Sequence, residues 1–377
     1  MTPRLGIYVH WPYCARICPY CDFTVVRDRG RAEEAAALGG AILADLEGQA
    51  TVLGPRALGS IFFGGGTPSL MDPALVAAVI AAARRLFPVV APLEVSLEAN
   101  PSTAESGRFG ALAAAGVTRL SLGVQSFADE DLRFLGRNHD VAAAHLALGS
   151  AQEAFGRVSL DLIYGLPGRT HAHLAAQLGR AAAAGVEHVS AYELTIEPGT
   201  AFHRAVARGR FASVDAGEGA DLYGIKTRVL EDLGFDAYEV SNHARRPSAR
   251  CAHNLVYWRG GEYLGVGPSA HGRRLTGEGW RATIAETALP AYIARVGDTG
   301  VGWAEDVLLT PRERAEERVM MGLRTEEGVD LVDLAPLPMD GLGALLEEGF
   351  LTRTAARLQA TPKGRLVLNA IVAILAR

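Results

Sequence analysis

Six short runs of apolar, often β-branched residues recur along the first half of the chain, separated by Ala- and Leu-rich stretches with helical spacing. The runs predict strands at residues 6–11, 60–64, 93–98, 119–124, 158–164 and 188–194. The stretches between them predict helices, among them 32–50, 73–86 and 173–184. Regular alternation of strand and helix favours a parallel sheet with right-handed crossovers. Six such units form either an open doubly wound sheet or an incomplete barrel.

Polar and glycine residues follow most of these predicted strands directly. The turn Gly64-Gly65-Gly66-Thr67 ends one strand, and Glu98, Gln125 and Asp161 stand at or near the ends of three others. In barrel and α/β folds the carboxyl ends of the strands form the functional edge. Turn chemistry alone also favours Gly and Asn at such places, but recurrence after four strands indicates one shared site.

The second half of the chain has a looser pattern. A helix is predicted at residues 217–233 and an edge strand at 236–243. From about residue 304 the sequence predicts a helix from Thr310, a helix at 342–348, a hairpin at 351–360 and a helix from Thr361, which is a winged-helix-like order. We therefore expect a partial barrel at 1–245, a connecting segment at 246–303 and a C-terminal winged-helix-like module at 304–377.

Composition and charge narrow the functional class. Lys and Arg number 37 and Asp and Glu 42, a formal net charge of −5, and no block of basic residues stands out. Residues 305–377 hold nine Lys or Arg against twelve Asp or Glu, so we expect no nucleic acid as a partner. Residues 1–7 lack a basic segment followed by an apolar one, and 366–377 are too short for a bilayer of about 30 Å. We expect no integral membrane segment and a cytoplasmic location.

Three of the four cysteines lie close together, as Cys14, Cys18 and Cys21, directly after the first predicted strand. Clustered thiols in a reducing compartment more often bind metal than form disulfides. A [4Fe–4S] cluster takes thiolate ligands, and three from one loop leave one iron open to another ligand. A structural zinc site is the alternative; it needs a fourth ligand such as His10 or Cys251, and no second C-x2-C pair exists. The pattern therefore favours the cluster.

The segment at 8–23, with its C-x3-C-x2-C spacing, resembles the radical-SAM superfamily, where SAM is S-adenosylmethionine. The stretches at 63–69, 96–101, 120–127, 161–167, 195–200 and 253–258 extend the match. Together they resemble the oxygen-independent coproporphyrinogen III oxidase family, and most closely its heme-chaperone branch, over nearly the whole chain. The resemblance implies a partial (β/α)6 barrel of the TIM type. It also implies a [4Fe–4S] cluster on Cys14, Cys18 and Cys21, with SAM chelated by the open iron.

The same resemblance implies a set of residues that contact SAM. A carboxylate such as Glu98 suits an ammonium group or ribose hydroxyls, and Arg137 suits a carboxylate. For Arg137 the alternative is a solvated helix charge. Thr67, Gln125, Arg137 and Asp161 match positions that line a second SAM or substrate pocket in the oxidase branch. The full set is Tyr8, Tyr20, Gly64, Gly65, Gly66, Thr67, Glu98, Gln125, Arg137 and Asp161.

The segment at 251–258 resembles the H-N-x-x-Y-W signature of the chaperone branch, which is linked to heme binding. Imidazole and thiolate both ligate heme iron, and aromatic rings beside them can stack on a macrocycle. The heme-binding candidates are Cys251, His253, Asn254, Tyr257, Trp258 and His271. The alternatives are a hydrogen-bonded structural role for His253 and a buried thiol for Cys251.

Two departures separate the chain from the oxidase branch. Phe23 stands where the oxidase has a further cysteine, and only seven residues precede Tyr8, where the oxidase has an extension. We therefore expect a heme chaperone that binds the cluster, SAM and heme, and transfers heme to an acceptor such as a respiratory protein. The alternatives are an oxygen-independent coproporphyrinogen III dehydrogenase, converting propionates to vinyls by radical oxidative decarboxylation, and a radical-SAM enzyme with an unrelated substrate.

Overall fold

The computed structural model describes residues 4–376, and a twelve-stranded sheet forms its centre. Six strands run parallel in chain order: β1 (Leu5–Trp11), β4 (Leu58–Gly65), β5 (Val89–Ala99), β6 (Arg119–Gln125), β7 (Val158–Tyr164) and β8 (His188–Glu193). A doubly wound sheet would reverse its strand order at a switch point, and these six strands do not. The prediction of a partial (β/α)6 barrel is therefore confirmed.

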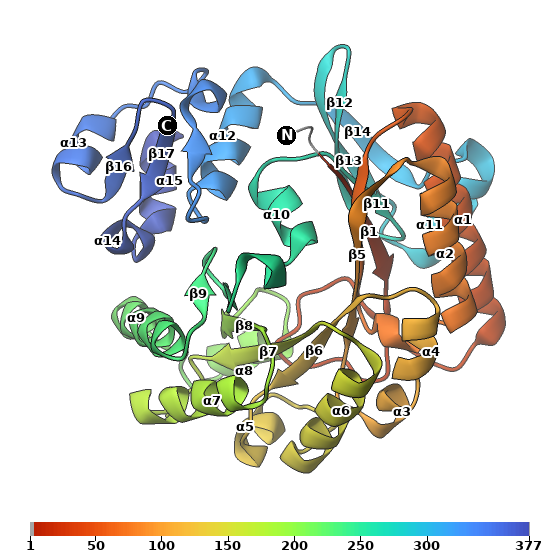
Figure 1. The fold of residues 1–377 in the computed structure, drawn as a ribbon, viewed down its shortest axis with the longest axis horizontal. Helices are drawn as coiled ribbons and strands as arrows, with labels where there is room; N and C mark the ends of the chain where they lie inside the picture. Colours follow the sequence, from red (N-terminus) through yellow and green to blue (C-terminus); the bar gives the residue numbers. More distant parts are fainter. Residues whose placement is uncertain (1–3, 377) are drawn as a thin grey trace.

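Helices cover the outer side of the curved sheet (Figure 1). They are α1 (Ala32–Leu53), α2 (Pro73–Leu86), α3 (Thr103–Ser106), α4 (Phe109–Ala114), α5 (Asp129–Phe134), α6 (Val141–Ala154), α7 (His171–Ala183) and α9 (Ala216–Asp232). The short α8 (Ala201–Ala207) instead contacts the loop after β1, where the Phe202 amide donates to the Pro19 carbonyl at 2.9 Å. Many of the helices begin at an Asp or Thr whose side chain accepts an amide hydrogen, as Asp140 does for α6 and Thr170 for α7.

Side-chain alternation along the strands separates the core from the barrel interior. Leu120 and Leu122 of β6 are fully buried, whereas Ser121, between them, lines a cavity inside the barrel. On β7, Leu160 is likewise buried and Asp161 faces the same cavity. Because successive strand residues point to opposite faces, each strand places a polar residue inward between apolar ones.

Residues 246–303, expected as a connecting segment, contribute strands to the main sheet. β11 (Tyr263–Val266) pairs parallel with β1, and β12 (His271–Thr276), β13 (Gly279–Ala285) and β14 (Trp303–Leu308) continue antiparallel from it. α11 (Leu289–Thr299) packs against α1. β11 is short, and β12, β13 and β14 are partly exposed with many polar residues, so these strands lack the apolar runs that marked the others.

Two further elements differ from the predicted secondary structure. The edge strand expected at 236–243 is a pair of short antiparallel strands, β9 (Asp236–Ala237) and β10 (Asn242–Ala244), with β10 also antiparallel to β8. α10 (Ala252–Trp258) lies on the inner side of the sheet, against β1, β4 and β5, rather than among the outer helices (Figure 1).

The C-terminal module has the predicted order of helix, helix, hairpin and helix. It comprises α12 (Pro311–Gly322), β15 (Val329–Asp330), α13 (Leu342–Glu347), β16 (Leu351–Arg353), β17 (Arg357–Ala360), α14 (Pro362–Arg365) and α15 (Leu368–Leu375). A buried cluster that includes Val319, Leu358 and Ile371 forms a core separate from that of the barrel.

Across residues 4–376, none of the helices combines the length and the apolar character that crossing a bilayer requires. The expectation about the N-terminal segment falls partly on residues 1–3, which lie outside the described residues.

Candidate functional site

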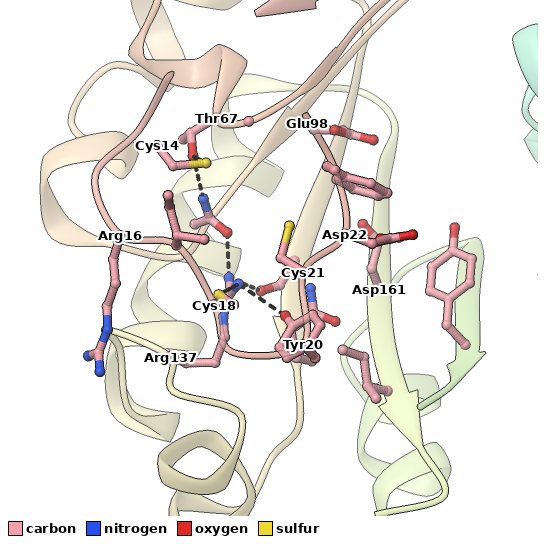
Figure 2. A pocket seen from close by; sticks show the side chains of 18 of the residues that line it. Cys14, Arg16, Cys18, Tyr20, Cys21, Asp22, Thr67, Glu98, Arg137 and Asp161 are labelled. Carbon is pink, nitrogen blue, oxygen red and sulfur yellow. Dashed lines mark hydrogen bonds between the residues drawn. The ribbon is translucent and has the colours of Figure 1, made fainter. Parts of the chain in front are cut away.

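The three clustered cysteines lie on the loop that follows β1. Cys14 belongs to β2 (Tyr13–Cys14), which pairs with β3 (Val26–Arg27), and Cys18 and Cys21 follow in the loop between these strands. All three line one pocket of about 370 Å³ at the carboxyl ends of the parallel strands (Figure 2). Cys14 is buried, Cys18 and Cys21 are half-buried, and all three thiols are free.

The glycine turn after β4 packs tightly on this loop. The Gly66 amide donates to the Trp11 carbonyl at 2.7 Å, and the Thr67 amide donates to the Tyr13 carbonyl at 2.8 Å. A Cβ on Gly66 would lie 2.7 Å from the Pro12 carbonyl, too close for any other residue. The glycine therefore lets the turn approach, which brings the Thr67 hydroxyl to 3.6 Å from Cys14 Sγ.

Arg137 ties the cysteine loop to the barrel. Its Nη1 donates to Cys18 Sγ at 3.3 Å and to the Tyr20 hydroxyl at 3.4 Å, and its Nη2 donates to the Gly123 carbonyl at 3.1 Å (Figure 2). Tyr20 and Cys18 favour the charged guanidinium and raise the pKa of Arg137, although burial opposes them. The alternative of a solvated helix charge is therefore wrong for this residue.

Asn100 completes this network and was not among the predicted site residues. Its Oδ1 accepts from Arg137, and its Nδ2 donates to Thr67 Oγ1 at 3.2 Å. The only signal in the sequence was its place directly after a strand, within the run Glu98-Ala99-Asn100-Pro101. Tyr192, at the end of β8, also lines the pocket without having been predicted.

Two carboxyl groups, Glu98 of β5 and Asp161 of β7, line this pocket (Figure 2). Burial, with a smaller contribution from the charge of Asp161, raises the pKa of Glu98 to about 8. Burial also raises the pKa of Asp161, although its oxygens accept from Ser121 Oγ at 2.9 and 3.0 Å. Both groups also line a second cavity deeper in the barrel, so they form a polar wall between the two spaces.

The other predicted SAM contacts occupy nearby positions. Gly65, Gly66, Thr67, Tyr20 and Gln125 line the cysteine pocket. Gln125 has a φ of 66°, an unusual backbone conformation for a residue with a side chain and one that clusters at functional sites. Tyr8 lines the deeper cavity instead, with its ring against the position of Gly64.

His253 lies fully buried inside the barrel, on α10. Its Nδ1 lies 2.9 Å from Ser60 Oγ and its Nε2 lies 2.7 Å from the Tyr257 hydroxyl, so both ring nitrogens have partners. Burial lowers its pKa to about 3, which keeps the imidazole neutral. The ring also stacks on Phe62, with 5.2 Å between ring centroids. In this conformation His253 has the hydrogen-bonded structural role that was the alternative to heme ligation.

The remaining heme-binding candidates do not converge on one open pocket. Cys251 is fully buried, 3.5 Å from Glu94 Oε1, and burial raises the pKa of its thiol to about 12. Asn254, Tyr257 and His253 line the deeper cavity, whose volume of about 170 Å³ is below the roughly 300–1,000 Å³ usual for ligand sites. Neither Trp258 nor the exposed His271 lines that cavity.

The zinc alternative finds no support in this arrangement. Between residues 4 and 376 no three His, Cys, Asp or Glu side chains converge closely enough to hold a single ion. His10, the proposed fourth ligand, has its Nδ1 3.0 Å from the Tyr8 hydroxyl and its Nε2 2.9 Å from the Thr24 carbonyl.

Comparison with known proteins agrees with this geometry. The profile of the radical SAM superfamily matches residues 8–176, and that of the HemN C-terminal domain matches residues 309–367. The chain is 41% identical to the mitochondrial radical S-adenosyl methionine domain-containing protein 1 of Bos taurus, over 87% of this chain and 75% of that protein. It is 37% identical to the heme chaperone HemW of Mycobacterium tuberculosis, over 97% of this chain and 93% of the relative.

The fold has a close counterpart among solved structures. Coproporphyrinogen III oxidase (HemN) from Escherichia coli superimposes with a TM-score of 0.81 at 23% sequence identity, covering 100% of this chain and 90% of the oxidase. At that identity the likeness concerns the fold alone, whereas the sequence relatives are close enough to assign a family. The chain belongs to the radical SAM superfamily and, within it, to the family of the heme chaperone HemW.

Proposed function

We propose that this chain is a heme chaperone that holds a [4Fe–4S] cluster and SAM in its barrel, binds heme and passes it to an acceptor protein, such as a respiratory protein. The observation that carries the proposal is the similarity to a protein named as a heme chaperone, at 37% identity over 97% of the chain. Phe23 adds support, because the oxidase branch resembled by the sequence has a cysteine at this position.

The donor set on the cysteine loop fits a [4Fe–4S] cluster. Cys14, Cys18 and Cys21 supply three thiolates, and Arg137, 3.3 Å from Cys18 Sγ, adds a positive charge that stabilises them. With SAM on the open iron, such a cluster supplies one-electron reduction, which in this superfamily cleaves SAM. Thr67, whose hydroxyl lies 3.6 Å from Cys14 Sγ, fixes the position of that thiolate.

The residues around the cysteine pocket are suited to hold SAM. Because its pKa is about 8, Glu98 keeps its proton at neutral pH and can both donate and accept a hydrogen bond with ribose hydroxyls. Arg137, whose Nη atoms already donate to Cys18, Tyr20, Asn100 and Gly123, would hold the cysteine loop in place around SAM. We assign SAM binding to Tyr8, Tyr20, Gly64, Gly65, Gly66, Thr67, Glu98, Gln125, Arg137 and Asp161.

The cluster assignment is tested by anaerobic reconstitution. Replacing Cys14, Cys18 and Cys21 by Ala should remove the brown absorption and the bound iron and sulfide. Cys251→Ala is the matched control, because this buried thiol lies outside the loop and should leave the iron content unchanged. Iron and sulfide retained by the triple variant would contradict the assignment.

The chaperone function is tested against the oxidase alternative with the reconstituted protein. With SAM, a reductant and coproporphyrinogen III, we expect no protoporphyrinogen over many turnovers. Heme added to the same preparation should bind and then move to an apo-acceptor such as an apocytochrome. Protoporphyrinogen formed over many turnovers would make the chain a biosynthetic enzyme instead.

His253 and its neighbours on α10 remain candidates for the heme ligand within this proposal. Ligation by His253 would break the two hydrogen bonds of its ring. For His253 to reach heme iron, its ring must leave Ser60 and Tyr257, and α10 must move out of the barrel. His253→Ala should then weaken heme binding, and an unchanged affinity would exclude this residue as the ligand.

A further inference from the structure

An open groove of about 770 Å³ lies beside the cysteine loop, between β3, the start of α1 and α11. One wall is apolar and consists of Leu289, Pro290 and Ile293 of α11, with Ala35 of α1 opposite. Val26 of β3 also lines the groove, with 38% of its surface exposed. The groove is more than four times as large as the cavity that His253 lines, which measures about 170 Å³.

Three arginines, Arg27, Arg29 and Arg31, stand along this groove. Arg31 forms an exposed pair with Glu34, at 3.3 Å. In the described part of the chain, the guanidinium groups of Arg27 and Arg29 have neither a hydrogen bond nor an ion pair. With Asp28 and Glu34 counted, the groove carries a net charge of +1. Two cations are therefore available to a ligand that brings its own carboxylates.

The stability of α1 does not explain these arginines. Arg31 is the N-cap of this 22-residue helix and makes no capping hydrogen bond, whereas Asp or Thr caps α2, α6, α7 and α12. A positive side chain at a helix N-terminus also opposes the helix dipole. Glu33 and Glu34 in the first turn already offset that dipole, so the arginines, rather than the helix end, would attract an anion in the groove. Residues that break a local rule without a structural gain point to a function.

The groove is joined directly to the cluster loop. Cys14 pairs with Arg27 in the ladder between β2 and β3, and the Asp28 amide donates to the Cys14 carbonyl at 2.8 Å. A ligand held by Arg27 and Arg29 would therefore lie against the strand that carries one of the three cysteine ligands.

We propose that this groove is the docking site for heme, resting on the proposed heme-chaperone function. Heme is an apolar disc with two carboxylates on one edge. The apolar wall of α11 matches its face, and Arg27 and Arg29 match its propionates. In this arrangement heme docks without opening the barrel, and His253 keeps its two hydrogen bonds.

The test is heme titration of the cluster-loaded protein, followed by the Soret band. Arg27→Ala with Arg29→Ala should weaken heme binding about tenfold, as expected for two partly exposed charge pairs. Arg84→Ala with Arg85→Ala, an exposed pair at the end of α2, removes the same charge and should not change the affinity. Iron content shows that each variant keeps its cluster.

A second ligand without charged propionates distinguishes the loss of charge recognition from a general loss of the folded binding site. Heme dimethyl ester, whose propionates are neutral, should bind the wild type and the Arg27/Arg29 variant equally. Ile293→Glu, which puts a carboxylate on the apolar wall, should weaken binding of both ligands, whereas Ile293→Leu should not.

The outcomes separate the two proposals. A wild-type chain that binds no heme overturns the heme-chaperone function, and this inference with it. Normal heme affinity in both groove variants, with weakened binding in His253→Ala, overturns the groove alone and favours the barrel interior.

Discussion

The Glu98 carboxyl, which lies between the two cavities of the barrel, should make the stability of the folded chain depend on pH. Burial, with a smaller effect of Asp161, raises its pKa from 4.5 to about 8. One pKa unit corresponds to 1.36 kcal/mol, so ionising this group in the folded chain costs at most about 5 kcal/mol more than in the unfolded chain.

The sign of the effect follows from proton linkage. The unfolded chain loses this proton near pH 4.5, whereas the folded chain keeps it up to about pH 8. The contribution of Glu98 to the free energy of unfolding is therefore fully present below pH 4.5 and is lost as the pH rises through 8. Because Gln cannot ionise, the Glu98→Gln variant should not lose stability in this way as the pH rises.

Urea unfolding of the cluster-free, reduced chain between pH 5 and 9 provides the measurement. The free energy of unfolding of Glu98→Gln, relative to wild type, should increase by several kcal/mol from pH 5 to pH 9. Glu33→Gln, at an exposed position of α1, controls for the removal of one carboxylate. If the wild-type and Glu98→Gln curves run parallel over this range, the carboxyl ionises normally and the reasoning is refuted.

Three further substitutions test local packing. Thr310→Ala removes the capping box of α12 and should lower the free energy of unfolding by about 1 kcal/mol in urea. Leu358→Ala, in the core of the C-terminal module, should lower it by roughly 2–5 kcal/mol, and a loss well below this would mean that the core collapses around the gap. Gly66→Ala places a Cβ 2.7 Å from the Pro12 carbonyl, so iron content after reconstitution should fall; Gly40→Ala, with open space around its Cβ, should retain full iron content.

The barrel was predictable because its elements are locally encoded. The parallel strands read as short runs rich in apolar and β-branched residues with polar positions between them, and the helices between the strands carry their own start signals, such as Asp140 and Thr170. The carboxyl ends of parallel strands share one edge, so Glu98, Gln125 and Asp161 had to gather there with the cysteine loop. The C-terminal module was equally visible, since Thr310 and Thr361 each open a helix.

The antiparallel extension was not predictable in the same way. β11 to β14 are short or partly exposed, and their stability comes from pairing with β1 and with one another rather than from an apolar run of their own. The sequence alone therefore left residues 246–303 as a connecting segment.

The sequence by itself determined the alternation of strands and helices, the cysteine spacing and the polar residues that follow the strands, because local periodicity and turn chemistry specify them. The same pattern also allowed an open doubly wound sheet, and the barrel was expected only from the resemblance to the radical-SAM superfamily. Only the tertiary structure decided their partners. Arg137 reaches Cys18 across 119 residues, and His253 reaches Ser60 across 193. Whether a histidine is free to bind metal or already holds two hydrogen bonds depends on which side chains the folded sheet brings to its ring, and no local pattern in the sequence encodes contacts over such distances.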